Sequence, residues 1–140
     1  MGSHSGFEVP RFVVLLGHFV LLIVLLWDVE VVAKSSLPWS QRDDHSRVES
    51  VQTQITAGLA TSTTLVAIEL TCFMIGASLF FPTQCLSSAV VHSISFVSLA
   101  FFMADTFHVK YFWILFVLTA LSCMAEVTIL FGALILNKPL

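Results

Sequence analysis

The chain has 140 residues, of which 57% are hydrophobic and 11% are charged. Soluble domains carry about 25% charged residues, and a water-soluble fold could not cover this much apolar surface. The net charge of −3 and the lack of a basic cluster or of a nucleic-acid-reading motif exclude nucleic acid as an expected partner. The composition therefore predicts an integral membrane protein with a single membrane domain over residues 1–140.

The first apolar run follows Arg11 and predicts a transmembrane span over residues 11–32. About 20 apolar residues cross a hydrocarbon core, so this run is slightly short. The long Arg11 side chain could reach from the end of the run to the headgroups, or the helix could extend through Val29, Val31 and Val32. A signal peptide cleaved before Lys34 is the alternative interpretation of this run. The acidic residues Asp28 and Glu30 beside that position disfavour cleavage.

Residues 28–53 form the longest connection and hold most of the charged residues of the chain. Pro38 and Trp39 within this connection are typical of an interfacial anchor, because tryptophan favours the headgroup level of a membrane. Ser40 could cap a short helix that runs into the second span. The sequence otherwise predicts one long loop between the first and second spans.

Three further spans are expected at about residues 55–81, 85–104 and 111–136. Pro82 is expected to end the second span, because its ring cannot continue the helical hydrogen bonds. The short turns would make these three spans antiparallel neighbours, and the run lengths exclude a β-barrel. The predicted fold class is an all-α membrane protein, a four-transmembrane-helix antiparallel bundle with one long loop between helices 1 and 2.

The charges that flank the spans predict an orientation in the membrane. Four spans place both termini on the same side, and that side carries two basic residues against four on the other. Because cytoplasmic loops are enriched in lysine and arginine, this count favours termini outside the cytoplasm. The basic residues are Arg11 and Lys138 on the side of the termini, and Lys34, Arg42, Arg47 and Lys110 on the other side.

Each predicted span carries one ionisable residue inside its apolar run. A charged group at the centre of a membrane costs about 2.5–3.5 kcal/mol, so these side chains are expected to face the interior of the bundle. At about 1.5 Å per residue, all of them fall within about two helical turns of one another in depth. We call this group the intramembrane polar cluster, and it consists of His18, Glu69, His92 and Glu126.

Three roles for the intramembrane polar cluster remain open. Hydrogen bonds between the glutamates and the His, Ser or Thr side chains of neighbouring helices would give it a structural role. Two imidazoles and two carboxylates could instead bind zinc or iron, although no HExxH or ExxH spacing supports this. A proton or substrate path is the third role, although broken helices and paired repeats are missing. Because catalytic and nucleotide-binding motifs are also missing, we expect no enzyme, no cofactor and no metal.

Landmarks along nearly the whole chain together resemble the transmembrane protein 107 family. None of them is a catalytic signature, and the order and spacing of the landmarks carry the resemblance. Residues 40–54 depart most from the pattern of the family. The landmarks are Val9-Pro10-Arg11-Phe12, His18, Leu37-Pro38, Val66-Ala67-Ile68-Glu69-Leu70, Phe73, Gly76, Ser78, Phe80, Thr83-Gln84, His92, Phe101-Phe102, Tyr111, Trp113, Phe116-Val117, Glu126 and Lys138-Pro139.

The resemblance implies a non-enzymatic protein of the ciliary transition zone, in the Meckel–Joubert membrane module at the base of the cilium. It implies membrane lipids and other transition-zone membrane proteins such as the tectonics as partners. The implied roles are cilium biogenesis, ciliary gating and Hedgehog signalling, which links the family to ciliopathy. It also implies cytoplasmic N- and C-termini, against the small difference in basic residues. A small intramembrane enzyme or carrier that uses the polar cluster is the alternative.

Overall fold

The computed structural model describes residue 6 and residues 8–76, 81–104 and 109–135, and the account below is confined to them. These residues form five α-helices and one short 3-10 helix, with no strand among them. The predicted turn at 105–108, the predicted span ends at 77–80 and 136, and Lys138 lie outside this part of the chain. The elements are α1 (Glu8–Trp27), α2 (Val29–Ser35), η1 (Trp39–Gln41), α3 (His45–Ile75), α4 (Pro82–Ala104) and α5 (Val109–Ile135).

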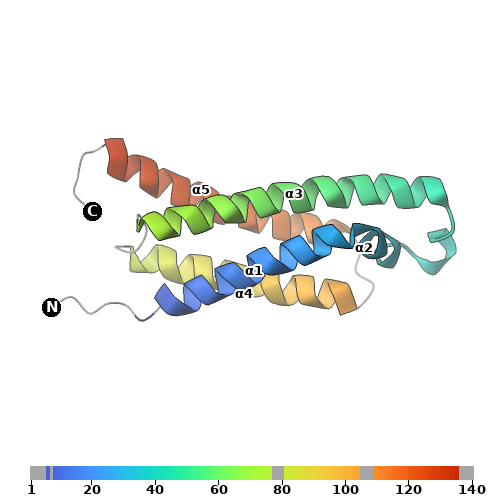
Figure 1. Ribbon diagram of the computed structural model, residues 1–140, viewed down its shortest axis with the longest axis horizontal. Coiled ribbons are helices and arrows are strands. Elements are labelled where there is room, and N and C mark those ends of the chain that lie inside the picture. The colour runs from blue at the N-terminus through green and yellow to red at the C-terminus, as the bar shows by residue number, and fades with distance from the viewer. Residues whose placement is uncertain (1–5, 7, 77–80, 105–108, 136–140) are drawn as a thin grey trace.

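Four of the helices, α1, α3, α4 and α5, are long and apolar enough to cross a membrane. They lie side by side as a bundle, with the start of α1 and the end of α5 at the same end (Figure 1). Consecutive long helices run in opposite directions (Figure 1). The predicted four-transmembrane-helix antiparallel bundle is therefore confirmed.

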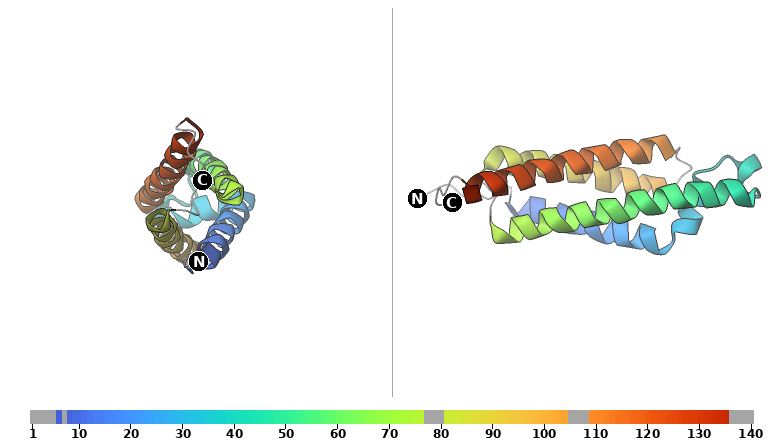
Figure 2. Two further views of the ribbon diagram at one scale, coloured as in Figure 1. Left: turned by 90° about the vertical axis from the view of Figure 1, so that its left-hand side faces the viewer. Right: turned by 90° about the horizontal axis from the view of Figure 1, so that it is seen from above.

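The order of the helices around the bundle differs from the expected one. In the end-on view of Figure 2, α1, α3, α5 and α4 occupy successive corners. α1 packs against α3 and α4, and α5 packs against the same two helices. α3 and α4 therefore lie at diagonally opposite corners, and the prediction that the second and third spans are neighbours is wrong. A short turn fixes only the end at which the next helix begins, whereas side-chain packing decides which corner that helix occupies.

The connection predicted as a long loop is largely helical, since it contains α2 and η1, and α3 begins at His45 rather than at residue 55. The Asp44 side chain caps α3 by accepting from the backbone N–H groups of Ser46 and Arg47 at 3.1 and 3.4 Å. The hydrogen bond from the Ser46 hydroxyl holds the pKa of Asp44 below its ordinary value, so the cap is charged at neutral pH. This cap and the packing of α2 on α3 keep the polar residues after Asp44 helical.

Glycine, rather than proline, ends the second long helix. α3 stops at Ile75, and Gly76 follows in the left-handed conformation with a φ of 84°, which glycine adopts without steric cost. Pro82 is the first residue of α4, where its missing N–H group has no helical partner to lose. The prediction that Pro82 ends the second span is therefore wrong.

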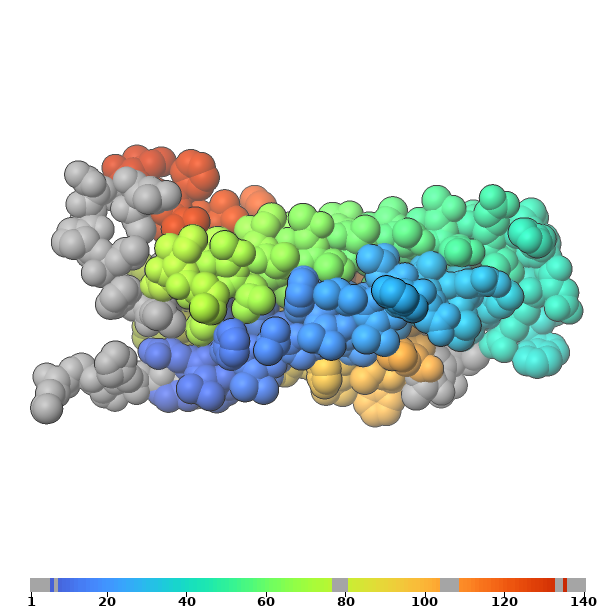
Figure 3. All heavy atoms as spheres, viewed as in Figure 1, coloured from blue at the N-terminus to red at the C-terminus, as the bar shows by residue number. Residues whose placement is uncertain are grey.

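The interior of the bundle divides into an apolar half and a polar half. The apolar half lies beside α2 and is filled by side chains that are at most 4% exposed. The polar half lies beside the start of α1 and contains the buried charged residues. In Figure 3, α1 and α3 abut and cover one face of this interior. The apolar half consists of Leu22, Leu25, Ile55, Leu59, Leu99, Phe102 and Phe112.

Gly58 allows α3 and α5 to approach closely within the apolar half. A Cβ atom added at this glycine would stand 2.9 Å from Cζ of Phe112 and closer still to Cε1. The Phe112 ring packs against Phe102 and Trp113, with ring centroids 6.4 and 6.0 Å away. The ring therefore cannot move aside without disturbing its neighbours.

We expect Gly58→Ala to lower the free energy of unfolding by about 1–3 kcal/mol, because an overpacked core must displace a side chain or the backbone. Gly132→Ala is the matched control, since no described atom lies within 4 Å of a Cβ at that position. The control should be neutral or stabilise α5 by up to about 1 kcal/mol. Thermal unfolding of the detergent-solubilised protein measures both variants. Equal melting temperatures for the wild type and Gly58→Ala would contradict the tight contact with Phe112.

Candidate functional site

The structure places the four residues of the intramembrane polar cluster in the polar half of the interior, one on each long helix. His18 is 1% exposed, and Glu69, His92 and Glu126 are fully buried. The Nε2 atom of His92 lies 2.9 Å from Oε2 of Glu69. The Nδ1 atoms of His92 and His18 are 2.7 Å apart. Three of the four residues thus form one hydrogen-bonded chain that joins α1, α4 and α3.

Glu126 joins this chain through Arg11, a residue expected at the headgroup level. The Arg11 guanidinium is fully buried and forms an ion pair with Oε1 of Glu126. Its Nη2 atom also lies 3.5 Å from Oε1 of Glu69, and its Nε atom donates to Oγ of Ser88 at 3.1 Å. The prediction that the Arg11 side chain reaches out to the headgroups is therefore wrong, because two buried carboxylates attract the guanidinium inward.

The spacing between Arg11 and His18 is the sequence signal that indicates this inward position. Residues seven apart occupy the same face of a helix that packs in a bundle. Because Arg11 shares a helix face with His18, it is also expected to point into the bundle. The buried residues of α1 follow this spacing and are Arg11, Leu15, His18, Leu22 and Leu25.

Glu69 on α3 is the centre of the network. Its Oε1 atom accepts from Ser88 Oγ on α4 at 2.6 Å and from Ser122 Oγ on α5 at 3.0 Å. The same atom faces Arg11 on α1, while Oε2 is bonded to His92. Each of the other three long helices therefore brings at least one donor to this carboxylate. Several charge-assisted hydrogen bonds of this kind are what a buried carboxylate requires in a medium of low dielectric constant.

Sequence reasoning expected Ser or Thr side chains as partners of the glutamates but did not single out Ser88, Ser122 or Gln84 as members of the cluster. Ser88 lies four residues before His92, and Ser122 lies four residues before Glu126, so each serine shares a helix face with an ionisable residue of the cluster. Gln84 on α4 donates to Oε1 of Glu126 at 3.4 Å and so links α4 to α5. We call the enlarged set the polar network; its bonds join every pair of long helices. Its members are Arg11, His18, Glu69, Gln84, Ser88, His92, Ser122 and Glu126.

The hydrogen bonds restrict where the protons of the network can sit. An ionised Glu69 only accepts, so Nε2 of His92 carries a hydrogen. The Nδ1 atoms of His92 and His18 share one hydrogen, which either ring can donate. The Arg11 guanidinium lies beside both carboxylates and offsets part of their negative charge. Pairing buried carboxylates with a buried cation in this way lowers the cost of placing them in hydrocarbon.

The donor set does not fit a metal ion. Both ring nitrogens of His92 are engaged, one with Glu69 and one with His18. The guanidinium of Arg11 lies against both carboxylates, where a metal cation would have to sit. Within the described ranges, no group of three or more His, Cys, Asp or Glu residues is arranged to hold a metal ion. The geometry favours hydrogen bonding between helices over metal binding.

Comparison with known proteins places the chain in a family. The family model of transmembrane protein 107, described as a transmembrane protein, matches residues 9–130. Transmembrane protein 107 of Homo sapiens is 32% identical over 136 residues, which cover 94% of this chain and 96% of the relative. The relatives of that name in Rattus norvegicus and Danio rerio are 34% and 31% identical over 83% of this chain, and over 81% and 84% of their own lengths. No solved structure matches the chain at a significant level.

These similarities extend over the bundle and the polar network alike, and the four candidate spans agree with the description of the family. The chain is a multi-pass membrane protein that belongs to the transmembrane protein 107 family.

Proposed function

We propose that this protein is a non-enzymatic component of the ciliary transition zone membrane that helps to place other transition-zone proteins there. Through this role it would support cilium assembly, ciliary gating and Hedgehog signalling. Membership of the transmembrane protein 107 family over most of the chain supports the proposal, since the sequence landmarks of that family imply this role. The same landmarks imply cytoplasmic termini, so the end of the bundle that carries Arg11 would face the cytoplasm.

The observation that carries the non-enzymatic part of the proposal is the complete burial of the polar network. Glu69, His92, Glu126 and Arg11 have no exposed surface, and hydrogen bonds or ion pairs join them to one another. One oxygen of this group, Oε2 of Glu126, is buried without a hydrogen-bond partner among the described residues. A catalytic or transport site needs a cavity in which a substrate reaches its reactive groups. Here a substrate would first have to separate the helices. The network is therefore suited to hold four helices in one arrangement.

A fixed arrangement of helices presents a fixed outer surface to the membrane. On α4 this surface is a row of large apolar side chains formed by Val90, Ile94, Val97 and Phe101, each at least 49% exposed. In lipid, helices associate through close packing of such surfaces rather than through the hydrophobic effect. We propose that membrane lipids and the spans of transition-zone proteins such as the tectonics and other Meckel–Joubert module members pack on this outer surface.

The structural role of the polar network predicts strong coupling between Arg11 and Glu126. Arg11→Met should lower the free energy of unfolding by about 3–5 kcal/mol, because two carboxylates stay buried without their cation. Arg11→Met combined with Glu126→Met should cost less than the sum of the two single changes. Chemical unfolding of the four proteins in detergent measures the coupling.

Met124→Leu is the control for that cycle, because Met124 lies on α5, as Glu126 does, but has 65% of its surface exposed. It should leave the free energy of unfolding unchanged. Additive costs of the two charge substitutions would show that the ion pair does not help to hold the bundle.

The proposed role in the cell predicts where the protein and its neighbours are found. In ciliated cells that lack the endogenous protein, a biotin-ligase fusion of the wild type should label tectonics at the base of the cilium. Glu126→Ala should lose most of this labelling, because the helices no longer keep their arrangement, whereas Met124→Leu should retain it. Quantitative mass spectrometry of biotinylated proteins gives the comparison. Wild-type protein that is absent from the ciliary base would contradict the proposal.

A Glu69→Gln variant separates the proposal from the alternative of an intramembrane enzyme or carrier. A variant that keeps its fold and its labelling pattern but loses a measurable hydrolytic or transport activity would favour the alternative. A variant that loses stability and labelling together supports the structural role.

A further inference from the structure

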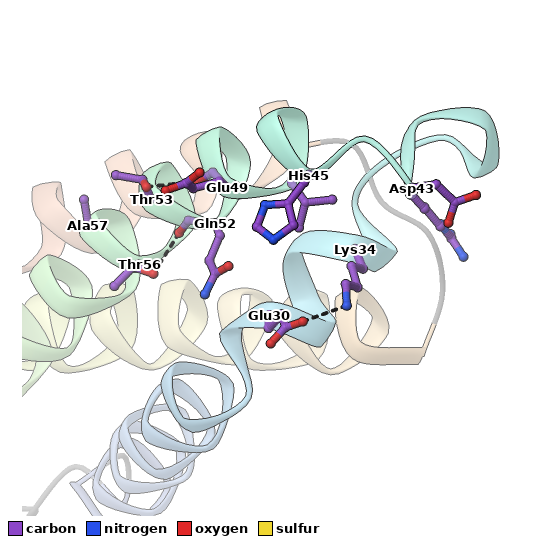
Figure 4. A pocket seen from close by; sticks show the side chains of 11 residues that line it. Glu30, Lys34, Asp43, His45, Glu49, Gln52, Thr53, Thr56 and Ala57 are labelled. Atoms are coloured by element: carbon purple, nitrogen blue, oxygen red, sulfur yellow. Dashed lines mark hydrogen bonds and ion pairs between the residues drawn. The ribbon is translucent and has the colours of Figure 1, made fainter.

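A polar pocket of about 810 Å³ opens between α2 and the first turns of α3. It lies at the end of the bundle away from Arg11, outside the polar network. In Figure 4, the Glu30–Lys34 pair of α2 lies on one side of the opening, and the His45 ring and the Gln52 amide of α3 lie on the other. A volume of this size is in the range of pockets that bind small molecules.

The position of the pocket along the bundle corresponds to the headgroup level of a membrane. α3 has 31 residues, so its length of about 46 Å exceeds a hydrocarbon core of about 30 Å. The residues of α3 that line the pocket belong to its first turns, which extend beyond the core. Trp27 at the end of α1 and Trp39 in η1 are 90% and 81% exposed on this end of the bundle. Exposed tryptophans of this kind mark the interface between lipid and water.

The pocket is lined by charges of both signs, with acids in slight excess. Lys34 and Arg42 provide two cations, while Glu30, Asp43 and Glu49 provide three carboxylates. The hydrogen bond from Lys34 Nζ to Glu30, 2.6 Å long, holds the pKa of that carboxyl below its ordinary value, so Glu30 is ionised at neutral pH. A phosphate can contact the cations while an ammonium group contacts the carboxylates. The excess of negative charge disfavours a ligand that is anionic overall.

An outer face of α3 that carries small side chains leads from the pocket into the membrane. Ala57 lines the pocket, and Ala60, Thr64 and Thr71 are exposed farther along the helix. The hydroxyl of Thr64 donates to its own helix, to the carbonyl oxygen of Ala60 at 2.9 Å, so this face is apolar toward lipid. Thr64 and Thr71 also line a second hollow of about 330 Å³ beside Leu130 of α5. Ala57 and Thr64 are about 10 Å apart along the axis, which is within the depth of one leaflet.

We propose that this end of the molecule binds one zwitterionic glycerophospholipid, of the phosphatidylethanolamine or phosphatidylcholine class. The headgroup occupies the pocket between α2 and α3, with its phosphate toward Lys34 and its ammonium toward Glu49. Glu30 stays paired with Lys34, and Arg42 donates to the backbone carbonyl oxygens of Leu37 and Ser35 at 3.1 and 3.5 Å. One acyl chain lies along the small residues of α3 from Ala57 to Thr64. The site differs from the general lipid contact of the outer surface, because it selects a headgroup.

Native mass spectrometry of the detergent-solubilised full chain tests the proposal. The wild type should retain one added palmitoyl-oleoyl-phosphatidylethanolamine or palmitoyl-oleoyl-phosphatidylcholine in preference to the matching phosphatidylglycerol. Lys34→Ala and Glu49→Gln should each weaken binding of the zwitterionic lipids by about fivefold, the size of one lost ion pair at a partly exposed site. The matched controls are Arg47→Ala and Asp28→Asn, which remove exposed charges outside the pocket and should bind as the wild type does.

A second arm tests the acyl chain. Ala57→Phe should block the path below the pocket and weaken lipid binding, whereas Ala100→Phe on the exposed face of α4 should not. Free glycerophosphoethanolamine should fail to compete, because it has the headgroup alone. Three outcomes would each overturn the proposal. Phosphatidylglycerol could bind as tightly as the zwitterionic lipids, the pocket variants could bind lipid as their controls do, or the free headgroup could compete fully.

Discussion

Hydrocarbon offers no hydrogen-bond partners, so a carboxylate inside a membrane must find its donors on neighbouring helices. Glu69 meets this constraint by accepting from all three other long helices, through Arg11, Ser88, His92 and Ser122. Such bonds add little net stability in a membrane, but any other arrangement of the helices would leave the carboxylate without donors. The position of each helix in the bundle therefore depends on this one side chain.

The apolar and polar halves of the interior contribute differently to the fold. In the apolar half, close contacts such as that between Gly58 and Phe112 set how near the helices approach, but aliphatic side chains can be exchanged between partners at little cost. In the polar half, specific donors face specific acceptors on other helices, so the network distinguishes the observed order of helices from its alternatives. This division explains how α1 and α4 pack side by side in the same direction although a short turn does not join them.

The four spans could be predicted from the sequence, because an apolar run of about 20 residues is long enough to cross a hydrocarbon core as a helix. The inward face of each span follows as well, since His18, Glu69, His92 and Glu126 are too costly to place in lipid. Arg11 was misjudged because an arginine at the edge of an apolar run usually flanks the membrane, and only its partners on other helices decide otherwise. The corner occupied by α4 could not be predicted either, because it depends on contacts among residues far apart in the sequence. The extent of helix within residues 33–52 was underestimated, because the polarity of these residues hides the packing of α2 on α3.

The diagonal placement of α3 and α4 has a consequence for biosynthesis. The chain consists of two helical hairpins, α1 with α3 and α4 with α5, and each hairpin packs internally without the other. The contacts between parallel neighbours, α1 with α4 and α3 with α5, form only when the hairpins dock. The same holds for the bonds across the diagonals, between α1 and α5 and between α3 and α4. Arg11 and Glu69 both belong to the first hairpin, so they enter the membrane together during synthesis. They can therefore form their ion pair while the second hairpin is still being synthesised.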